Sequence, residues 1–134
     1  MVFTWDSSVF ARFWMVADYF PQIAVREAGL PDVHRAAAML NALGRSVHVE
    51  PVPVPADCSD GFGGAYWSQP EALLDPAVGQ AMSGVAMLDP AVRERALTRL
   101  RADLASGVWH QRHGHLLGRD ELDVGVRLLV ATPA

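Results

Sequence analysis

The sequence predicts an α/β fold, and three observations lead to that class. Its 134 residues match the most common size of one domain. Hydrophobic residues make up 51% of the chain, which is enough to build a core and too many for an intrinsically disordered protein. Strand-like segments near both ends and in the middle alternate with segments of helical periodicity, an order typical of α/β proteins.

The chain opens with a predicted strand that leads into a predicted helix. Residues 1–5 combine β-branched and aromatic side chains, which favour strands. Residues 6–8 supply one aspartate and two serines as the N-cap of a helix over residues 9–20. A proline cannot continue a helix, so Pro21 should end this one near Tyr19.

A second helix and a proline-rich strand follow. Pro31 and Asp32 predict the start of the helix, and Gly44 predicts its end. Its predicted buried stripe consists of Ala36, Met39, Leu40 and Leu43. Residues 47–54 alternate valines with prolines that cannot donate to a ladder, so we expect this strand at the edge of a sheet.

The second half of the chain predicts a helical insertion, a long helix and a final strand. Prolines interrupt residues 65–88 repeatedly, which indicates short helices. Residues 90–106 carry the strongest helical pattern, with a proline at the start and Gly107 as the stop. Residues 109–121 are interpreted as a polar loop. Residues 123–131 predict a strand that is buried on both faces and pairs on both sides, antiparallel to at least one neighbour.

Charge, cysteine content and hydropathy exclude several classes of protein. The net charge of −4 argues against nucleic acid as the principal ligand, because such binding relies on clustered cations. The lone Cys58 cannot form an internal disulfide, which favours a reducing compartment, and the cytoplasm is the expected location. No apolar run is long enough to span a bilayer, and the N-terminus lacks the cationic start of a signal peptide, so no membrane association is expected.

The densest polar cluster of the sequence follows the proline-rich strand. Asp57, Cys58 and Asp60 precede the glycine-rich run from Gly61 to Gly64. A loop at the end of a strand is a favoured place for a substrate site in α/β proteins. The alternative is a local turn, in which Asp and Gly serve backbone geometry alone. The glycine spacing does not match that of a dinucleotide-binding loop.

Aromatic and histidine residues give weaker signals. Trp5, Trp14 and Tyr19 could line a pocket at the end of the first strand or form the core side of the helix, and both interpretations stay open. Three imidazoles, at His110, His113 and His115, have no carboxylate or thiolate at a standard metal-site spacing. They also lie far in sequence from the only thiol. No metal site and no covalent catalysis are therefore expected.

Five segments carry a resemblance to a known family. They are VPADCSDGF at 54–62, AYW at 65–67, PEALLDP at 70–76, DLASGVW at 103–109 and LDVGVRL at 122–128. Together they resemble the C-terminal portion of bacterial class I, Rossmann-like methyltransferases that depend on S-adenosylmethionine. The family often carries arginines where this chain has Ser68 and Gln69, so no anionic-ligand role is carried over to those two positions.

The resemblance implies that residues 1–134 form a single partial domain. It identifies the first strand as the fifth of the family sheet, the proline-rich strand as the sixth, at the edge, and the last strand as the seventh, antiparallel. The glycine-rich loop and the acidic residue that hold the methyl donor in the family have no counterpart here. The chain thus looks like a truncated product or a fragment, and we expect S-adenosylmethionine to be the cofactor of the intact family but not to bind this chain alone.

The resemblance also implies a small-molecule methyl acceptor. Methyl transfer is largely a matter of positioning, so no catalytic acid or base is assigned. We expect the acceptor to contact residues at the end of the first strand, in the first helix and around the polar cluster. This predicted set is Trp5, Asp6, Trp14, Tyr19, Asp57, Cys58, Asp60 and Trp67.

Two functions remain open from the sequence. The first is a small-molecule methyltransferase of which this chain forms the substrate-side portion, inactive alone. The second is a noncatalytic binding or interaction domain, which the missing glycine-rich loop favours. An uncovered side of the first strand would be a template for pairing, so we also expect possible self-association there.

Overall fold

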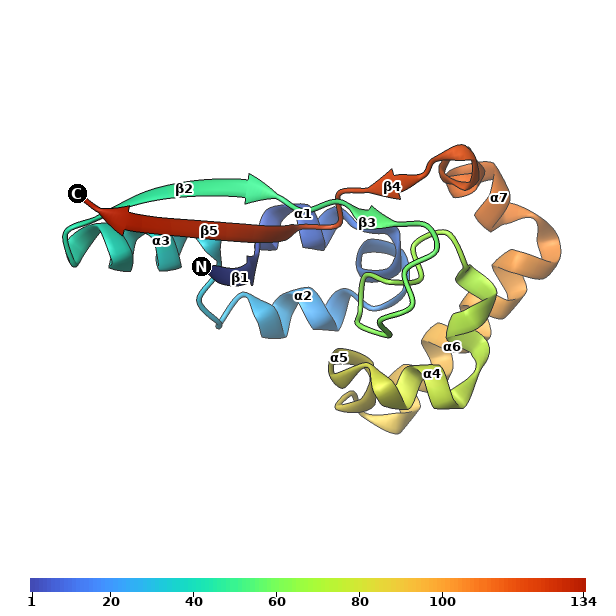
Figure 1. Cartoon of the computed structure of the whole chain (residues 1–134). Coiled ribbons are helices and arrows are strands. Elements are labelled where there is room, and N and C mark those ends of the chain that lie inside the picture. The colour runs from blue at the N-terminus through green and yellow to red at the C-terminus, as the bar shows by residue number, and fades with distance from the viewer.

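A three-stranded antiparallel sheet forms an elongated arm of the protein, and a lobe of short helices forms the rest (Figure 1). The computed structural model describes residues 1–134. The strand order is β1-β5-β2, with β1 at Val2–Trp5, β5 at Val126–Pro133 and β2 at Arg45–Pro51. This mixture of strands and helices confirms the predicted α/β class.

The proline-rich segment lies at a sheet edge, as predicted, but it does not form one continuous strand. β2 pairs only with β5, and the ladder ends where Pro51 lies opposite Arg127. The chain then enters a separate two-stranded sheet, in which β3 (Val54–Pro55) pairs with β4 (Glu121–Leu122). The prolines explain the division, since each removes a backbone donor from the ladder.

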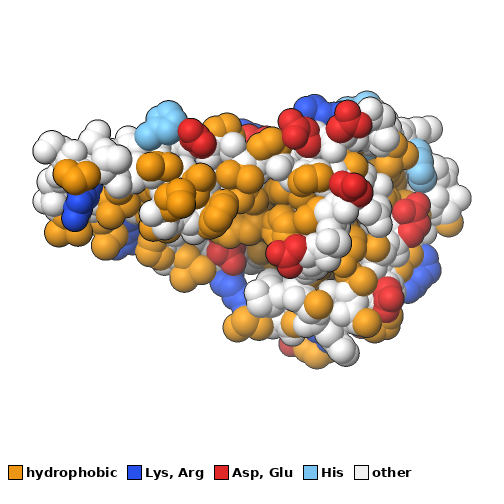
Figure 2. All heavy atoms as spheres, in the orientation of Figure 1, with side chains coloured by type: hydrophobic (Ala, Val, Ile, Leu, Met, Phe, Trp, Pro, Cys, Tyr) orange, Lys and Arg blue, Asp and Glu red, His pale blue; other side chains and the backbone are white.

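The last strand lies in the centre of the sheet and pairs with both neighbours in antiparallel orientation, as predicted. The prediction of burial on both faces is wrong. Arg127 and Leu129 are buried, whereas Leu128 and Val130 on the opposite face are only half-buried. Figure 2 shows hydrophobic side chains at the surface over the strands, so no layer of helices covers the face in view.

The predicted helix over residues 9–20 is broken into two pieces. α1 spans Ser7–Arg12 with Asp6 as its N-cap, and a π-helical turn, η1, spans Met15–Tyr19. Phe13 between them is extended, with φ −61° and ψ 132°. A regular helix cannot turn four successive side chains to one side, and the break allows residues 13–16 all to be buried. The predicted end near Tyr19 is confirmed.

Two helices connect this region to the sheet. α2 (Pro21–Glu27) begins at the proline that ends the preceding turn, and the sequence interpretation missed it. α3 (Val33–Ala42) begins and ends as predicted, capped by Asp32 and followed by Gly44 at φ 75°. Its predicted buried stripe is wrong, because Met39 and Leu43 are 59% and 76% exposed. α3 packs mainly against β2 and β5, and much of its apolar surface is exposed.

The helical lobe follows the sequence closely until Gly107. The predicted short helices are η2 (Pro70–Leu74), α4 (Pro76–Ala81) and α5 (Ser83–Ala86). The long helix α6 spans Pro90–Ser106 and stops at Gly107, which has a left-handed φ of 85°.

The predicted polar loop over residues 109–121 is wrong, because most of it is helical. α7 spans Val108–His113 and the 3₁₀ turn η3 spans Gly114–Gly118. Trp109 and Leu116 are buried, which draws this polar segment onto the core as short helices. No helix in the structure has the length and apolar character needed to cross a membrane.

Candidate functional site

A cavity opens at the carboxyl end of β1, between the sheet arm and the helical lobe. Its volume is about 150 Å³. The walls come from β1, α1, η1, α2 and the α4–α5 junction, and the apolar wall includes Trp5, Phe10, Met15, Ile23, Met82 and Val85. An apolar cavity of this volume accommodates a molecule such as benzene. It is therefore large enough for a small ligand or for one ring of a larger ligand.

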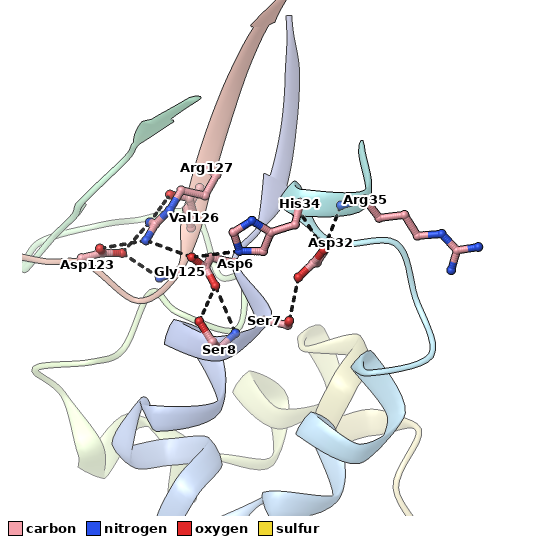
Figure 3. Close-up of polar contacts among 10 residues, drawn as sticks. All are labelled: Asp6, Ser7, Ser8, Asp32, His34, Arg35, Asp123, Gly125, Val126 and Arg127. Atoms are coloured by element: carbon pink, nitrogen blue, oxygen red, sulfur yellow. Dashed lines mark hydrogen bonds and ion pairs between the residues drawn. The ribbon is translucent and has the colours of Figure 1, made fainter. Parts of the chain in front are cut away.

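Four polar or charged residues also line the cavity: Ser7, Glu27, Asp32 and Ser83. Ser7 Oγ donates a hydrogen bond to Asp32 Oδ2 at 2.9 Å, which joins the start of α1 to the start of α3 (Figure 3). The other carboxylate oxygen of Asp32 accepts the backbone N–H groups of His34 and Arg35. Partial burial acts to raise the pKa of Asp32, but these hydrogen bonds outweigh it and hold the pKa below its ordinary value.

An ion-pair network fixes the end of β1 that carries Trp5. Arg127 on β5 is only 8% exposed, and its guanidinium donates two hydrogen bonds to Asp123, at 2.8 and 3.1 Å (Figure 3). The same guanidinium lies 3.7 Å from Asp6 Oδ2. Hydrogen bonds from Arg127 hold the pKa of Asp123 below its ordinary value, and those from Ser8 do the same for Asp6.

Gly125 brings the start of β5 into direct contact with the junction between β1 and α1. Its carbonyl accepts the backbone N–H of Asp6 at 2.7 Å, and its φ is 106°. A Cβ atom at this position would lie 2.9 Å from the backbone oxygen of Asp6 and 3.0 Å from the backbone nitrogen of Phe10. Only glycine therefore allows this close approach, which positions one wall of the cavity.

Of the predicted set, only Trp5 lines this cavity. Asp6 caps α1 through Ser8 and does not reach it. Trp14 and Trp67 lie in the core, where Trp14 Nε1 donates to the Trp67 carbonyl and Trp67 Nε1 donates to the Val54 carbonyl, both at 2.9 Å. The structure thus places these two tryptophans in buried structural positions.

Tyr19 lies on another part of the surface, beside α6. Its hydroxyl donates to Asp103 Oδ2 at 2.7 Å, and the Arg99 guanidinium lies over its ring. Burial and the neighbouring carboxylate of Asp103 raise the pKa of the phenol. The structure does not bring Tyr19 into the same concavity as Trp5.

The polar cluster approaches the cavity through its glycine-rich part. Asp57 and Asp60 are exposed, and the Cys58 thiol lies 3.7 Å from the Asp60 carbonyl. Further along, the Phe62 ring packs against Trp5 with centroids 6.2 Å apart, and Gly63 lines the cavity. The three predicted polar residues therefore lie shortly before Gly63 in the sequence but do not line the cavity.

The histidines do not assemble a metal centre. His113 Nε2 lies 2.7 Å from Asp18 Oδ2, and the ring packs against both Trp14 and Trp109. No group of three or more histidine, cysteine, aspartate or glutamate side chains is close enough together to hold a metal ion.

The glycine-rich run does not fit a nucleoside-containing methyl donor. A Cβ on Gly64 would lie 2.6 Å from a methyl group of Val124, so this glycine permits core packing and not the approach of a ligand. The run follows the short edge strand β3 and enters turns, with no helix N-terminus directly after it to face an anionic group. This glycine-rich run thus does not fit S-adenosylmethionine.

Several residues that line the cavity or position its wall were not identified as site residues from the sequence. Three of them belong to different elements, namely Glu27 in α2, Asp32 at the N-cap of α3 and Ser83 in α5. Their spacing in the sequence does not predict that they lie close together. Arg127 and Gly125 belong to a segment that carries the family resemblance, LDVGVRL, which was the one available signal for them.

Comparison with known proteins gives one informative similarity. No protein-family model and no curated protein matches the chain. A crystal structure from Anabaena variabilis, of a protein assigned as a methyltransferase from an antibiotic biosynthesis pathway, superimposes with a TM-score of 0.84 and 29% identity. The match covers 98% of this chain but 53% of that protein, so the chain spans about half of its length. The chain therefore has a methyltransferase-like α/β fold.

Proposed function

We propose that this chain is the substrate-side portion of an S-adenosylmethionine-dependent methyltransferase that acts on a small molecule. The observation that carries the proposal is the structural similarity at 29% identity over 98% of the chain. The assignment of that crystal structure to antibiotic biosynthesis supports a small-molecule acceptor. The resemblance of the five sequence segments points to the same class of enzyme.

In this proposal the cavity beside Trp5 holds the methyl acceptor. Ligands of α/β sheets bind beyond the carboxyl ends of strands, and Trp5 ends β1 at the cavity. The apolar wall would exclude water from the acceptor, while Ser7 and Glu27 offer polar contacts that orient it. The loop that carries Phe62 and Gly63 also carries the predicted polar residues Asp57, Cys58 and Asp60. These three would contact the acceptor at the entrance of the cavity.

In this enzyme the methyl donor would be bound by residues beyond these 134. The superimposed protein is about twice as long, and the glycine-rich run of this chain fits core packing and not a donor. S-Adenosylmethionine supplies the methyl group when it is bound in such enzymes. β1, β2 and β5 then correspond to the fifth, sixth and seventh strands of the family sheet, with β2 at the edge and β5 antiparallel to it.

A noncatalytic binding domain is the second candidate. One observation favours it, namely that the cavity is formed within this chain while its glycine-rich run fits core packing and not a methyl donor. Calorimetric titration of the 134-residue chain with S-adenosylmethionine bears on this point. We expect no binding, and micromolar binding would contradict the assignment of the donor to other residues.

Methyl transfer by the complete polypeptide that contains this chain tests the proposal. We expect transfer from labelled S-adenosylmethionine to a small molecule, and a loss of about tenfold or more in kcat/KM for Trp5→Ala, as for the loss of a buried aromatic contact. Leu43→Ala is the control, because Leu43 is 76% exposed and does not line the cavity. If both variants are folded by circular dichroism and are equally active, the cavity beside Trp5 does not bind the methyl acceptor.

A further inference from the structure

The charge of the cavity beside Trp5 is one-sided. Glu27 and Asp32 are its two charged lining residues, and no lysine, arginine or histidine lines it. The remaining polar groups, including the hydroxyls of Ser7 and Ser83, are neutral. An anionic ligand would therefore meet repulsion and find no cationic partner in the wall.

The negative charge of Glu27 contributes little to the stability of the fold. It is the last residue of α2, is half-buried, and its carboxylate forms no hydrogen bond or ion pair with another side chain. The C-terminal end of a helix carries a partial negative charge, which disfavours a carboxylate there. A ligand with a positive charge would compensate for both effects.

Asp32 differs from Glu27 because its carboxylate already has partners. It caps α3 through two backbone N–H groups and accepts the Ser7 hydroxyl. These contacts hold its pKa below the ordinary value and keep it ionised at neutral pH. Asp32 thus adds a fixed negative charge, whereas Glu27 has a carboxylate available for a direct contact.

The apolar wall limits the size and nature of the other part of the ligand. Trp5 supplies an aromatic side chain, and Met15 and Met82 supply flexible thioether side chains. Aromatic faces attract cations, and a volume of about 150 Å³ accommodates a group of the size of benzene. Figure 2 shows that hydrophobic side chains also surround the hollow between the sheet arm and the helical lobe.

We infer that this cavity takes an organic cation, namely a protonated amine joined to an apolar group about the size of one aromatic ring. The inference rests on the proposed function in one respect, since it treats the occupant as the methyl acceptor. The nitrogen that contacts Glu27 need not be the atom that receives the methyl group.

Three probes of one shape but different charge test the inference on the 134-residue chain. Benzylamine, benzyl alcohol and benzoate are titrated separately and followed by saturation-transfer NMR, which does not require the chain to be monomeric. We expect benzylamine to bind at least about fivefold more tightly than benzyl alcohol, the factor that corresponds to a favourable ion pair near a surface. Benzoate should bind most weakly.

Variants locate the preference for a positive charge. Glu27→Gln should reduce the preference for benzylamine over benzyl alcohol, with the charge of Asp32 remaining, while Glu94→Gln, at an exposed glutamate on α6, should leave it unchanged. No binding of benzylamine at millimolar concentration, equal binding of all three probes, or an unchanged preference in Glu27→Gln would each overturn the inference. Because no methyl transfer is measured, a failure of the proposed enzymatic function would not alter this result.

Discussion

Arg127 and Asp123 form a two-point ion pair at the start of β5, with nitrogen–oxygen distances of 2.8 and 3.1 Å. The arginine side chain is almost fully buried, and it also faces Asp6 at 3.7 Å. One cation therefore connects the turn before β5 with the junction between β1 and α1. Because that junction carries Trp5, the ion pair determines the position of one wall of the cavity.

Replacement of Arg127 should destabilise the fold. Arg127→Met keeps much of the side-chain volume but leaves the carboxylates of Asp123 and Asp6 without their cation. We expect a loss of about 2 kcal/mol in the free energy of unfolding, less than the roughly 3–5 kcal/mol for a fully buried pair, because 43% of the Asp123 side chain is exposed. Urea denaturation measures it. Arg101→Met, at an exposed position on α6, should change stability by less than about 0.5 kcal/mol.

Stability should fall in acid because of the same carboxylates. The pKa values of Asp6, Asp32 and Asp123 are all held below their ordinary value of 3.8 in the folded protein. Such groups bind fewer protons in the folded than in the unfolded state, so their contribution is complete well above pH 3.8 and is lost as pH falls below that value. Urea denaturation between pH 6 and pH 3 should show this fall.

A variant identifies the source of the acid sensitivity. Asp123→Asn should lower stability at pH 6 and flatten its decrease toward pH 3, since the group that titrates is gone. Asp57→Asn is the matched control, because Asp57 is exposed and lies outside the ion-pair network of Arg127. An identical pH dependence in Asp123→Asn and the unmodified chain would contradict the assignment.

Local signals in the sequence determine much of the fold. The limits of α6 follow from Pro90 at its start and Gly107 at its end, each of which acts within one turn. The edge position of β2 follows from prolines that cannot donate to a ladder. The helical turns α7 and η3, which end at Gly118, were missed because burial of Trp109 and Leu116 against distant residues, and not local periodicity, holds them in place.

The candidate site was much less predictable. Trp5 was identified because it ends a strand, a place where sites of α/β proteins commonly occur. Glu27 and Ser83 come from elements that are 56 residues apart in sequence and meet only in the folded chain. Trp14 and Tyr19 carry polar groups suited to a pocket, but these groups bond to Trp67 and Asp103 instead.

Gly125 should not tolerate a side chain. In Gly125→Ala the new Cβ would lie 2.9 Å from the Asp6 carbonyl oxygen, and the backbone would have to keep a φ of 106°. We expect a loss of about 1–3 kcal/mol in stability, measured by the shift of the urea midpoint. Gly118→Ala provides the control, since nothing lies within 4 Å of a Cβ there and its φ is not positive. Equal midpoints for the two variants would contradict the structural argument.

The free side of β1 should promote self-association. β1 pairs with β5 on one side only, and no strand covers its other side. Phe3 and Val2 are 70% and 44% exposed, so this edge combines unpaired backbone groups with apolar side chains. Such an edge is a template for pairing with a second strand. We expect light scattering of the 134-residue chain to show a mass above that of the monomer, increasing with concentration.

A charge at the edge should weaken that association. Phe3→Lys places a solvated cation on β1, whereas Leu43→Lys replaces another exposed apolar side chain, 76% accessible, outside the edge. We expect Phe3→Lys to shift the chain toward the monomer and Leu43→Lys to leave its mass distribution unchanged, because charged residues at an edge strand oppose pairing. If both variants shift it equally, general surface hydrophobicity drives association. If the unmodified chain is a monomer at all concentrations, β1 is not an association site for this chain.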